Sequence, residues 1–203
     1  MTRAVLLDLG NVVLGIDFHR VFASWAADAG VDKSRFYDNW QLDDAYKAHE
    51  VGAISFEEYC DHLSELFATS LTTGQWRTGW NSLWTSPFTS VIQLLPAVKE
   101  QYSLYAFTNT NETHAACWRS MYVDELATFE HIFVSSQIGA RKPDPGSFAK
   151  VCTDMDCHPN DVIFLDDSKE NVDGANEAGL DARHVAGEQA VFITQHNFSI
   201  GAH

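Results

Sequence analysis

The stretch "RAVLLDLGNVVL" (residues 3–14) decides the fold prediction. It opens with a short apolar run that stops at Asp8, and Gly10 follows two residues later. A short apolar run that ends in a turn is typical of a buried strand leading into a loop. The segment therefore predicts a strand over residues 3–7 with a carboxylate at its carboxyl end.

Three later segments repeat this pattern of a β-rich run that ends in polar residues. They are "SLYAFTNTN" (103–111), "HIFVSSQIG" (131–139) and "DVIFLDDSKEN" (161–171). Helices are expected between and after these strands, at residues 112–121, 146–155 and 169–178. A last strand is expected at residues 181–185. Because strands and helices alternate, the sequence predicts an α/β fold, a Rossmann-like open parallel sheet with helices on both faces.

The pattern changes between residues 17 and 86, where helical spacing replaces strand-like runs. Apolar residues recur every three or four positions in 18–25 and 76–84, and Ser55 and Glu58 have the spacing of a capping box. We expect the tryptophans of these stretches to pack in a core. The sequence thus predicts a helical cap at 17–86, inserted after the first strand and placed over the sheet's carboxyl edge, with the core formed by 1–16 and 87–203.

Composition excludes some partners. The 203 residues include 13 Lys and Arg against 28 Asp and Glu, a net charge of −15, which disfavours binding to nucleic acid or to an anionic membrane. No apolar run reaches the roughly 18 residues of a spanning helix. The four cysteines form no C-x-x-C pair and are expected to be reduced thiols of a soluble, cytoplasmic protein. The sequence does not indicate an oligomeric state.

Chemically distinctive polar residues follow the strand-like segments, and a parallel sheet would bring them to one edge. These residues are Asp8, Thr108, Asn109, Lys142, Asp166 and Asp167. One polar strand end would need no functional explanation, because turns are polar anyway. Clustered carboxylates without a matching number of cations indicate a hard divalent ion such as Mg2+, and a lone lysine beside a hydroxyl suits an anionic substrate group.

The sequence resembles the haloacid dehalogenase (HAD) superfamily over residues 3–185. Four segments carry this resemblance, in the order "LLDLGNVVL" (6–14), "YAFTNTN" (105–111), "GARKPDPGSF" (139–148) and "VIFLDDSKENVDGANEAG" (162–179). The first and last look most like bacterial sugar-1-phosphate phosphatases and the N-terminal phosphatase domain of mammalian epoxide hydrolase. The resemblance implies a Mg2+-dependent phosphatase that hydrolyses a small phosphorylated metabolite, with a sugar phosphate as the candidate substrate.

The resemblance also implies roles for the residues that would meet the substrate. Asp8 would be the nucleophile and form an aspartyl-phosphate intermediate. Thr108 and the backbone at Asn109 would hold the phosphoryl oxygens. Lys142 would bind the phosphoryl group and neutralise the charge that develops on it.

For the metal site, the resemblance implies that Asp8, Asp167 and the backbone carbonyl of Gly10 would ligate Mg2+. Asp166 belongs to the same site, where we expect it to orient the metal or the lysine. Asn171 stands where many relatives carry a carboxylate, so we expect it to form hydrogen bonds in place of direct ligation.

Gly10 departs from the family pattern. Phosphatases of the superfamily usually have a second Asp at this position, which acts as general acid and then as general base. Losing such a group typically costs about 10²- to 10⁴-fold in rate, so turnover should depend on the acidity of the leaving group. Asp17 and His19 are the nearest alternative proton donors in the sequence, although Asp17 is also a natural N-cap for the following helix.

Two other functions remain open. One is hydrolysis of a carbon–halogen or carbon–phosphorus bond, since superfamily members with those activities also lack the second Asp. Dehalogenases need no metal, so the carboxylate pair at 166–167 speaks against that branch. Phosphonate hydrolysis would need a cap lysine, and the candidates Lys33 and Lys47 are more simply solvated helix charges. The other function is non-catalytic binding of a phosphorylated ligand, which only Gly10 supports.

Substrate contacts from the cap are harder to predict. His49 and Glu50 precede Gly52 in an expected turn between two cap helices. A turn in that place could direct their side chains toward the active site. Both residues are therefore candidates for substrate binding.

Overall fold

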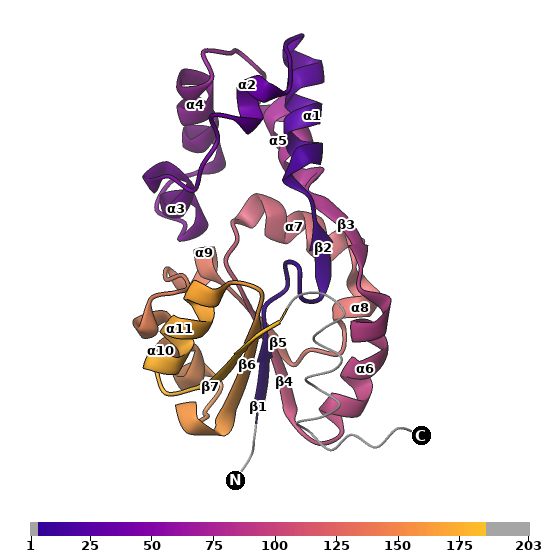
Figure 1. Cartoon of the computed structure of the whole chain (residues 1–203), viewed down its shortest axis with the longest axis vertical. Coiled ribbons are helices and arrows are strands. Elements are labelled where there is room, and N and C mark those ends of the chain that lie inside the picture. The colour runs from indigo at the N-terminus through magenta and orange to yellow at the C-terminus, as the bar shows by residue number, and fades with distance from the viewer. Residues whose placement is uncertain (1–3, 186–203) are drawn as a thin grey trace.

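A five-stranded parallel sheet forms the centre of the computed structural model, which describes residues 4–185 (Figure 1). The strand order is β5-β4-β1-β6-β7. The strands are β1 (Ala4–Leu7), β4 (Ser103–Thr108), β5 (His131–Val134), β6 (Val162–Asp166) and β7 (Asp181–His184). This confirms the predicted α/β fold with an open parallel sheet.

Helices cover both faces of the sheet, and the side chains of β1 show why. Ala4 and Leu6 pack in one buried cluster with Phe148 of α10, whereas Val5 and Leu7 pack in another with Leu95 of α6. Successive side chains of a strand point to opposite faces, so an uninterrupted apolar strand requires a cover on each side. The helices of the sheet region are α6 (Thr89–Lys99), α7 (Glu112–Met121), α8 (Val123–Leu126), α9 (Ser135–Ile138), α10 (Pro145–Asp154) and α11 (Lys169–Glu177), with a 3-10 turn η1 (Pro159–Asp161).

Some element boundaries differ from the prediction. The strand expected over 131–139 ends at Val134, and α9 follows it and ends at Ile138, with Gly139 as its C-cap. Helix α6 has no counterpart among the predicted elements, and it contains Pro96, a residue that normally ends a helix pattern. The helices expected at 112–121 and 146–155 agree with α7 and α10 to within one residue.

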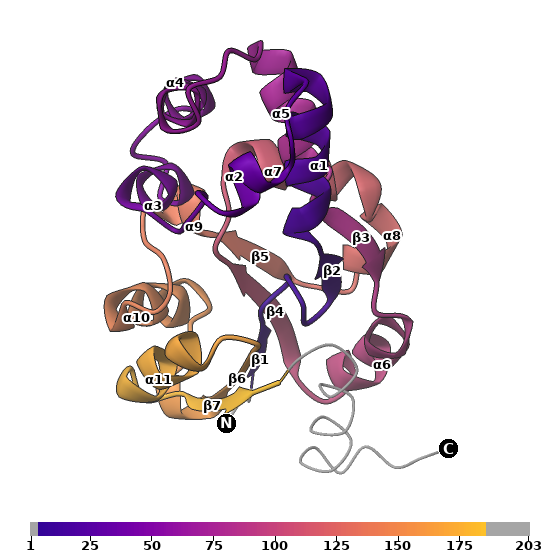
Figure 2. The ribbon, with the colours of Figure 1, turned by 45° about the horizontal axis from the view of Figure 1, so that its top comes forward.

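Five helices between residues 18 and 81 lie above the carboxyl edge of the sheet (Figures 1 and 2). They are α1 (Phe18–Ala29), α2 (Ser34–Tyr37), α3 (Asp44–Glu50), α4 (Phe56–Leu66) and α5 (Thr73–Asn81). Ser55 and Glu58 form the predicted capping box at the start of α4. Trp25 and Trp80 are fully buried with stacked rings 5.6 Å apart, as expected for core residues.

A short antiparallel ribbon joins this helical region to the sheet, which corrects the expectation of no strand between residues 17 and 86. Strand β2 (Leu14–Ile16) pairs with β3 (Trp84–Pro87), so Trp84 begins a strand and does not continue the helical series. A Cβ at Gly15 would lie 2.2 Å from Thr85 Oγ1, so the close pairing requires glycine. Strand β3 crosses the expected boundary between 86 and 87. The division into 1–16 with 87–203 and 17–86 stays a prediction, and residues 1–3 and 186–203 lie outside the described range.

Two further expectations concern the environment of the protein. Cys60, Cys117, Cys152 and Cys157 are all free thiols, as predicted. In residues 4–185, no helix combines the length and the apolar character needed to cross a membrane.

Candidate active site

The strand ends bring the motif residues together at the carboxyl edge of the sheet. Strand β1 lies between β4 and β6, and the register pairs Leu7 with both Ala106 and Leu165. Asp8 directly follows Leu7, so it lies level with the ends of β4 and β6, where Thr108 and Asp166 stand. Residues about 100 and 160 positions apart in the chain are therefore neighbours.

Lys142 is the centre of the charge arrangement. Its side chain is 1% exposed, and its Nζ donates hydrogen bonds to Asp8 Oδ1 at 2.7 Å, Asp166 Oδ2 at 2.6 Å and the Phe107 carbonyl at 2.8 Å. Burial alone would lower the pKa of this amine, but the adjacent carboxylates of Asp166 and Asp8 outweigh burial and raise it. The lysine is therefore a fixed cation between two carboxylates.

The loop that carries Lys142 is held from two directions. The Asn109 side chain accepts a hydrogen bond from the backbone N–H of Lys142 and donates one to its carbonyl, both at 2.9 Å. On the other side, a Cβ at Gly174 of α11 would lie 2.0 Å from the Pro143 carbonyl oxygen, so only glycine permits this approach. Backbone contacts thus fix the position of the lysine.

Asp166 is saturated with hydrogen bonds. It is fully buried, and its Oδ1 accepts from the Ser168 backbone N–H at 2.8 Å and from Asn171 Nδ2 at 3.0 Å. Its Oδ2 accepts from Lys142 Nζ and, at 3.1 Å, from the same amide of Asn171. These contacts suit a residue that orients Lys142 in place of ligating a metal, and Asn171 forms hydrogen bonds as expected.

Asp8 and Asp167 have carboxylates that favour a bound cation. Burial raises the pKa of Asp8 to about 7, with Lys142 opposing the rise and Asp166 and Asp167 adding to it. Burial also raises the pKa of Asp167, whose side chain accepts a hydrogen bond from Asn11 Nδ2 at 3.1 Å. A group that is hard to ionise alone becomes easier to ionise beside a cation.

The donor set fits Mg2+. Carboxylate oxygens of Asp8, Asp166 and Asp167 lie within 4.8 Å of one another, and because Asp166 is already hydrogen-bonded to Lys142, Ser168 and Asn171, Asp8 and Asp167 are the two that suit direct ligation. When ionised, these three carboxylates and the single ammonium of Lys142 leave a local charge of −2, which a divalent cation would neutralise. Mg2+ prefers one or two carboxylates together with substrate phosphate and water.

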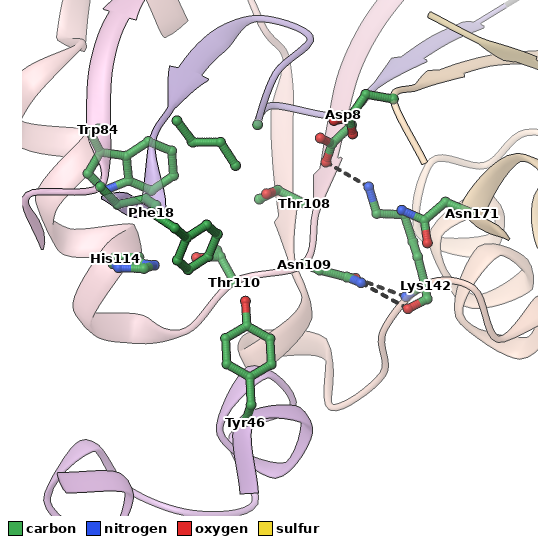
Figure 3. Close-up of a pocket in the computed structure, with 14 residues that line it drawn as sticks. Asp8, Phe18, Tyr46, Trp84, Thr108, Asn109, Thr110, His114, Lys142 and Asn171 are labelled. Carbon is green, nitrogen blue, oxygen red and sulfur yellow. Dashed lines mark hydrogen bonds and ion pairs between the residues drawn. The ribbon is translucent and has the colours of Figure 1, made fainter. Parts of the chain in front are cut away.

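A pocket of about 130 Å³ opens beside these charges (Figure 3). One side is formed by the strand-end residues, with Asp8, Thr108, Asn109 and Lys142 (Figure 3). The other side is largely aromatic and comes from the helical region, the ribbon and α7. Its residues include Phe18, Tyr46, Trp84 and His114.

The aromatic side also carries polar atoms. Thr110 Oγ1 and Trp84 Nε1 are buried and have no hydrogen-bond partner among the described residues. His114 donates from Nε2 to the Trp80 carbonyl at 3.0 Å, because a carbonyl can only accept. Burial lowers the pKa of His114 to about 3, so its ring is neutral. This wall can therefore bind uncharged polar groups such as hydroxyls.

The structure places the other candidate residues away from the pocket lining. His49 and Glu50 belong to the last turn of α3 and not to a turn between helices. Glu50 accepts a hydrogen bond from Arg141 Nε at 2.8 Å, and neither it nor His49 lines the pocket. Asp17 caps α1 through the His19 backbone N–H, as the alternative interpretation predicted, and His19 is exposed.

Tyr46 is one of several pocket residues that sequence reasoning missed, with Phe18, Trp84, Thr110 and His114. It lies on α3 four residues before Glu50, so the two side chains share one face of that helix. This spacing was the available signal, because a residue four positions before the candidate Glu50 lies on the same face of the helix. The sequence did not indicate Trp84 as a pocket residue, because its four-residue spacing from Trp80 is typical of the buried face of an amphipathic helix.

Comparison with known proteins identifies the family. The family model for haloacid dehalogenase-like hydrolases matches residues 45–185, which is more than half of the chain. The chain therefore belongs to this family of hydrolases, in agreement with the resemblance seen in its motifs.

Individual relatives extend this similarity over nearly the whole chain. D-ribitol-5-phosphate phosphatase of Bacteroides thetaiotaomicron is 21% identical over 186 residues, which cover 89% of this chain and 90% of the relative. The crystal structure of a HAD family enzyme from that organism, in complex with magnesium and inorganic phosphate, is 26% identical with a TM-score of 0.79 and covers 92% of this chain and 96% of its own. A HAD-like family hydrolase from Porphyromonas gingivalis reaches a TM-score of 0.83 over the whole of both chains at 19% identity, which shows the shared fold.

Proposed function

We propose that this protein is a Mg2+-dependent phosphomonoesterase that hydrolyses a small phosphorylated metabolite through an aspartyl-phosphate intermediate. The observation that carries the proposal is the buried arrangement of Lys142 between Asp8 and Asp166, with Asp167 in the same carboxylate cluster. The magnesium and phosphate bound by the related HAD enzyme support the same chemistry.

In this mechanism, Asp8 attacks the phosphorus atom and the ester oxygen leaves. Lys142 Nζ holds one Asp8 oxygen at 2.7 Å, which fixes the carboxylate and stabilises its ionised form. Thr108 and the Asn109 backbone, on the same side of the pocket, would receive phosphoryl oxygens. When bound by Asp8, Asp167 and the Gly10 carbonyl, Mg2+ would neutralise phosphoryl charge. Water then hydrolyses the aspartyl phosphate.

We propose a hydroxylated substrate such as a sugar or polyol phosphate. The unpartnered Thr110 Oγ1 and Trp84 Nε1, together with the neutral ring of His114, provide hydrogen-bonding groups for hydroxyls. A relative that acts on D-ribitol 5-phosphate supports this substrate class. A cytoplasmic location and the exclusion of nucleic acid and membrane partners remain predictions from composition.

The alternative functions have less support. Lys33 and Lys47 are exposed and do not line the pocket, so neither is placed to form the Schiff base that phosphonate hydrolysis would require. A halide-displacing site has no use for the carboxylates at 166 and 167. A non-catalytic binding protein would have no need for a nucleophile held by a buried lysine.

A phosphate-release assay tests the proposal. The protein should release inorganic phosphate from sugar and polyol phosphates in Mg2+ and stop in excess EDTA. Asp8→Asn should stay folded in a melting experiment but lose turnover, because an amide is a poor nucleophile. Full activity in EDTA, or wild-type kcat for Asp8→Asn, would contradict the mechanism.

A further inference from the structure

The glycine at position 10 leaves the proposed phosphatase without its usual acid, yet the pocket contains another group with a labile proton. Five described residues that line the pocket have titratable side chains. They are Asp8, Tyr46, His114, Lys142 and Asp167. A general acid among them would have to give a proton to the leaving oxygen.

Four of these five residues already have another role or have their protons in hydrogen bonds. Asp8 acts as the nucleophile, and Asp167 belongs to the proposed metal site. Lys142 directs its three N–H bonds to two carboxylates and a carbonyl. His114 uses its Nε2–H on the Trp80 carbonyl, and its lowered pKa prevents a second proton from binding at neutral pH.

Tyr46 is the remaining group, and its placement suits a proton donor. Its hydroxyl points from α3 into the pocket in Figure 3. Its ring is almost fully buried and packs against Trp40 and Trp80 with centroids 5.4 and 6.1 Å away, which limits its orientations. Burial, with the adjacent Glu50, raises the pKa of Tyr46 well above its ordinary value, so the hydroxyl stays protonated before the reaction.

Glu50 is the carboxylate beside this hydroxyl. The Glu50 carboxylate lies next to the Tyr46 hydroxyl and accepts a hydrogen bond from Arg141 Nε at 2.8 Å. The backbone carbonyl of Glu50 accepts a further hydrogen bond from Ser135 Oγ at 2.7 Å. These contacts hold the end of α3 against the region around β5 and Lys142, and so they also fix the position of Tyr46 on the same helix.

We propose that Tyr46 is the general acid that replaces the carboxylate missing at Gly10, and that Glu50 is a positioning residue for its hydroxyl. The inference rests on the proposed phosphatase function. As Asp8 forms its bond to phosphorus, the P–O ester bond breaks and its electron pair goes to the leaving oxygen. That oxygen takes the proton of Tyr46. Water then attacks the phosphorus of the aspartyl phosphate and returns a proton to the Tyr46 phenolate, so each turnover consumes one ester and one water.

The charges around Tyr46 are consistent with a short-lived phenolate. Glu50 disfavours it, whereas the nearby guanidinium of Arg141 stabilises it and opposes the rise in the Tyr46 pKa. The negative charge lasts only until the second step restores the proton. No oxidant or further reactant is needed.

The test compares two esters with the same protein preparation. In Mg2+, Tyr46→Phe should lose about 10²-fold in kcat on a simple alkyl phosphate, whose leaving group needs protonation. It should lose little on 4-nitrophenyl phosphate, whose leaving group departs without a proton. Because the result is the ratio of two rates on one sample, partial unfolding cancels. Tyr37→Phe, which changes an exposed tyrosine of the same helical region, should leave the ratio unchanged.

Two further variants sharpen the result. Glu50→Gln should shift the ratio in the same direction as Tyr46→Phe but less, since the hydroxyl remains while α3 loses its ion pair with Arg141 and the hydroxyl is positioned less well. Gly10→Asp combined with Tyr46→Phe should restore alkyl phosphate turnover. Position 10 tolerates this change, because an added Cβ would meet Ile16 Cδ1 at 3.4 Å, which that flexible side chain can accommodate.

The outcomes separate this inference from the function it rests on. If wild-type protein hydrolyses neither ester in Mg2+, the proposed phosphatase function fails, and the inference fails with it. If wild type is active but Tyr46→Phe slows both esters equally, or slows neither, Tyr46 is not the acid. In that case the phosphatase assignment stands and only the inference is overturned.

Discussion

Replacing Lys142 by methionine would leave Asp8 and Asp166 as buried carboxylates with no cation between them. The lysine is 1% exposed and pairs with these two residues at 2.7 and 2.6 Å. Methionine keeps most of the side-chain volume but removes the charge and three hydrogen bonds. Removing one partner of a buried ion pair typically costs about 3–5 kcal/mol. For a protein of this size, each kcal/mol lowers Tm by about 2–4 °C, so we expect a fall of about 6–20 °C.

This loss of stability should depend on pH. Lys142 is one of the groups that lower the pKa of Asp8, so without it that pKa rises further above about 7. A carboxyl whose pKa is raised in the folded state loses its stabilising effect as pH rises through that value. The destabilisation of Lys142→Met should therefore be larger at pH 8 than at pH 5. Melting curves by circular dichroism in EDTA at both pH values would measure it.

Matched controls make the test of Lys142 specific. Lys33→Met and Lys47→Met change exposed lysines and should alter stability by no more than about 0.5 kcal/mol, with little effect on turnover. Adding Asp166→Asn to Lys142→Met removes one unpaired charge and should recover part of the stability but not the activity. The reasoning is refuted if Lys142→Met melts at pH 8 like the two controls, or if all three substitutions affect kcat equally.

Two further predictions concern stability. In EDTA at pH 8, Asp8→Asn should melt at a higher temperature than wild type, because the wild-type carboxylate is ionised above its raised pKa of about 7 while it is buried beside Asp166. The difference in melting temperature should narrow as the pH falls toward 4, where the wild-type carboxyl is protonated. An equal difference at both pH values would contradict this explanation. Gly174→Ala should destabilise the protein and slow turnover, because its Cβ would collide with the Pro143 carbonyl and displace the Lys142 loop. Gly74→Ala is the control and should do neither, because its Cβ would have its nearest neighbour at 3.9 Å. Melting curves and kcat values of both variants would test this.

The sheet and the strand-end residues could be predicted because their signals are local. Asp8, Thr108 and Asp166 each stand at the end of a run of apolar or β-branched residues, and the parallel topology then gathers them. The same reasoning predicted the Asp17 cap, since a cap acts within two or three residues of itself. Local patterns of this kind are visible without knowledge of the tertiary structure.

The remaining features depend on contacts between distant parts of the chain. Strand β3 exists because it pairs with β2, about 70 residues earlier, and its own sequence "WTSP" is a weak strand signal. The orientation of Glu50 is set by Arg141, which lies 91 residues later. Tyr46 reaches the pocket on α3, which contacts with Arg141 and Ser135 hold against the core. The four-residue spacing of Tyr46 and Glu50 indicates a shared helix face, but it does not indicate which part of the core that face meets.

Arg141 and Lys142 are adjacent in the chain, but one contacts the helical region and the other contacts the strand ends. Arg141 binds Glu50 of the helical region, and Lys142 binds Asp8, the proposed nucleophile. Any opening of the helical region over α3 must break the Arg141 contact, and the same loop then holds Lys142 with one fewer anchor. The seating of α3 and the position of the proposed nucleophile are thus thermodynamically linked, because both depend on the short loop that carries Arg141 and Lys142.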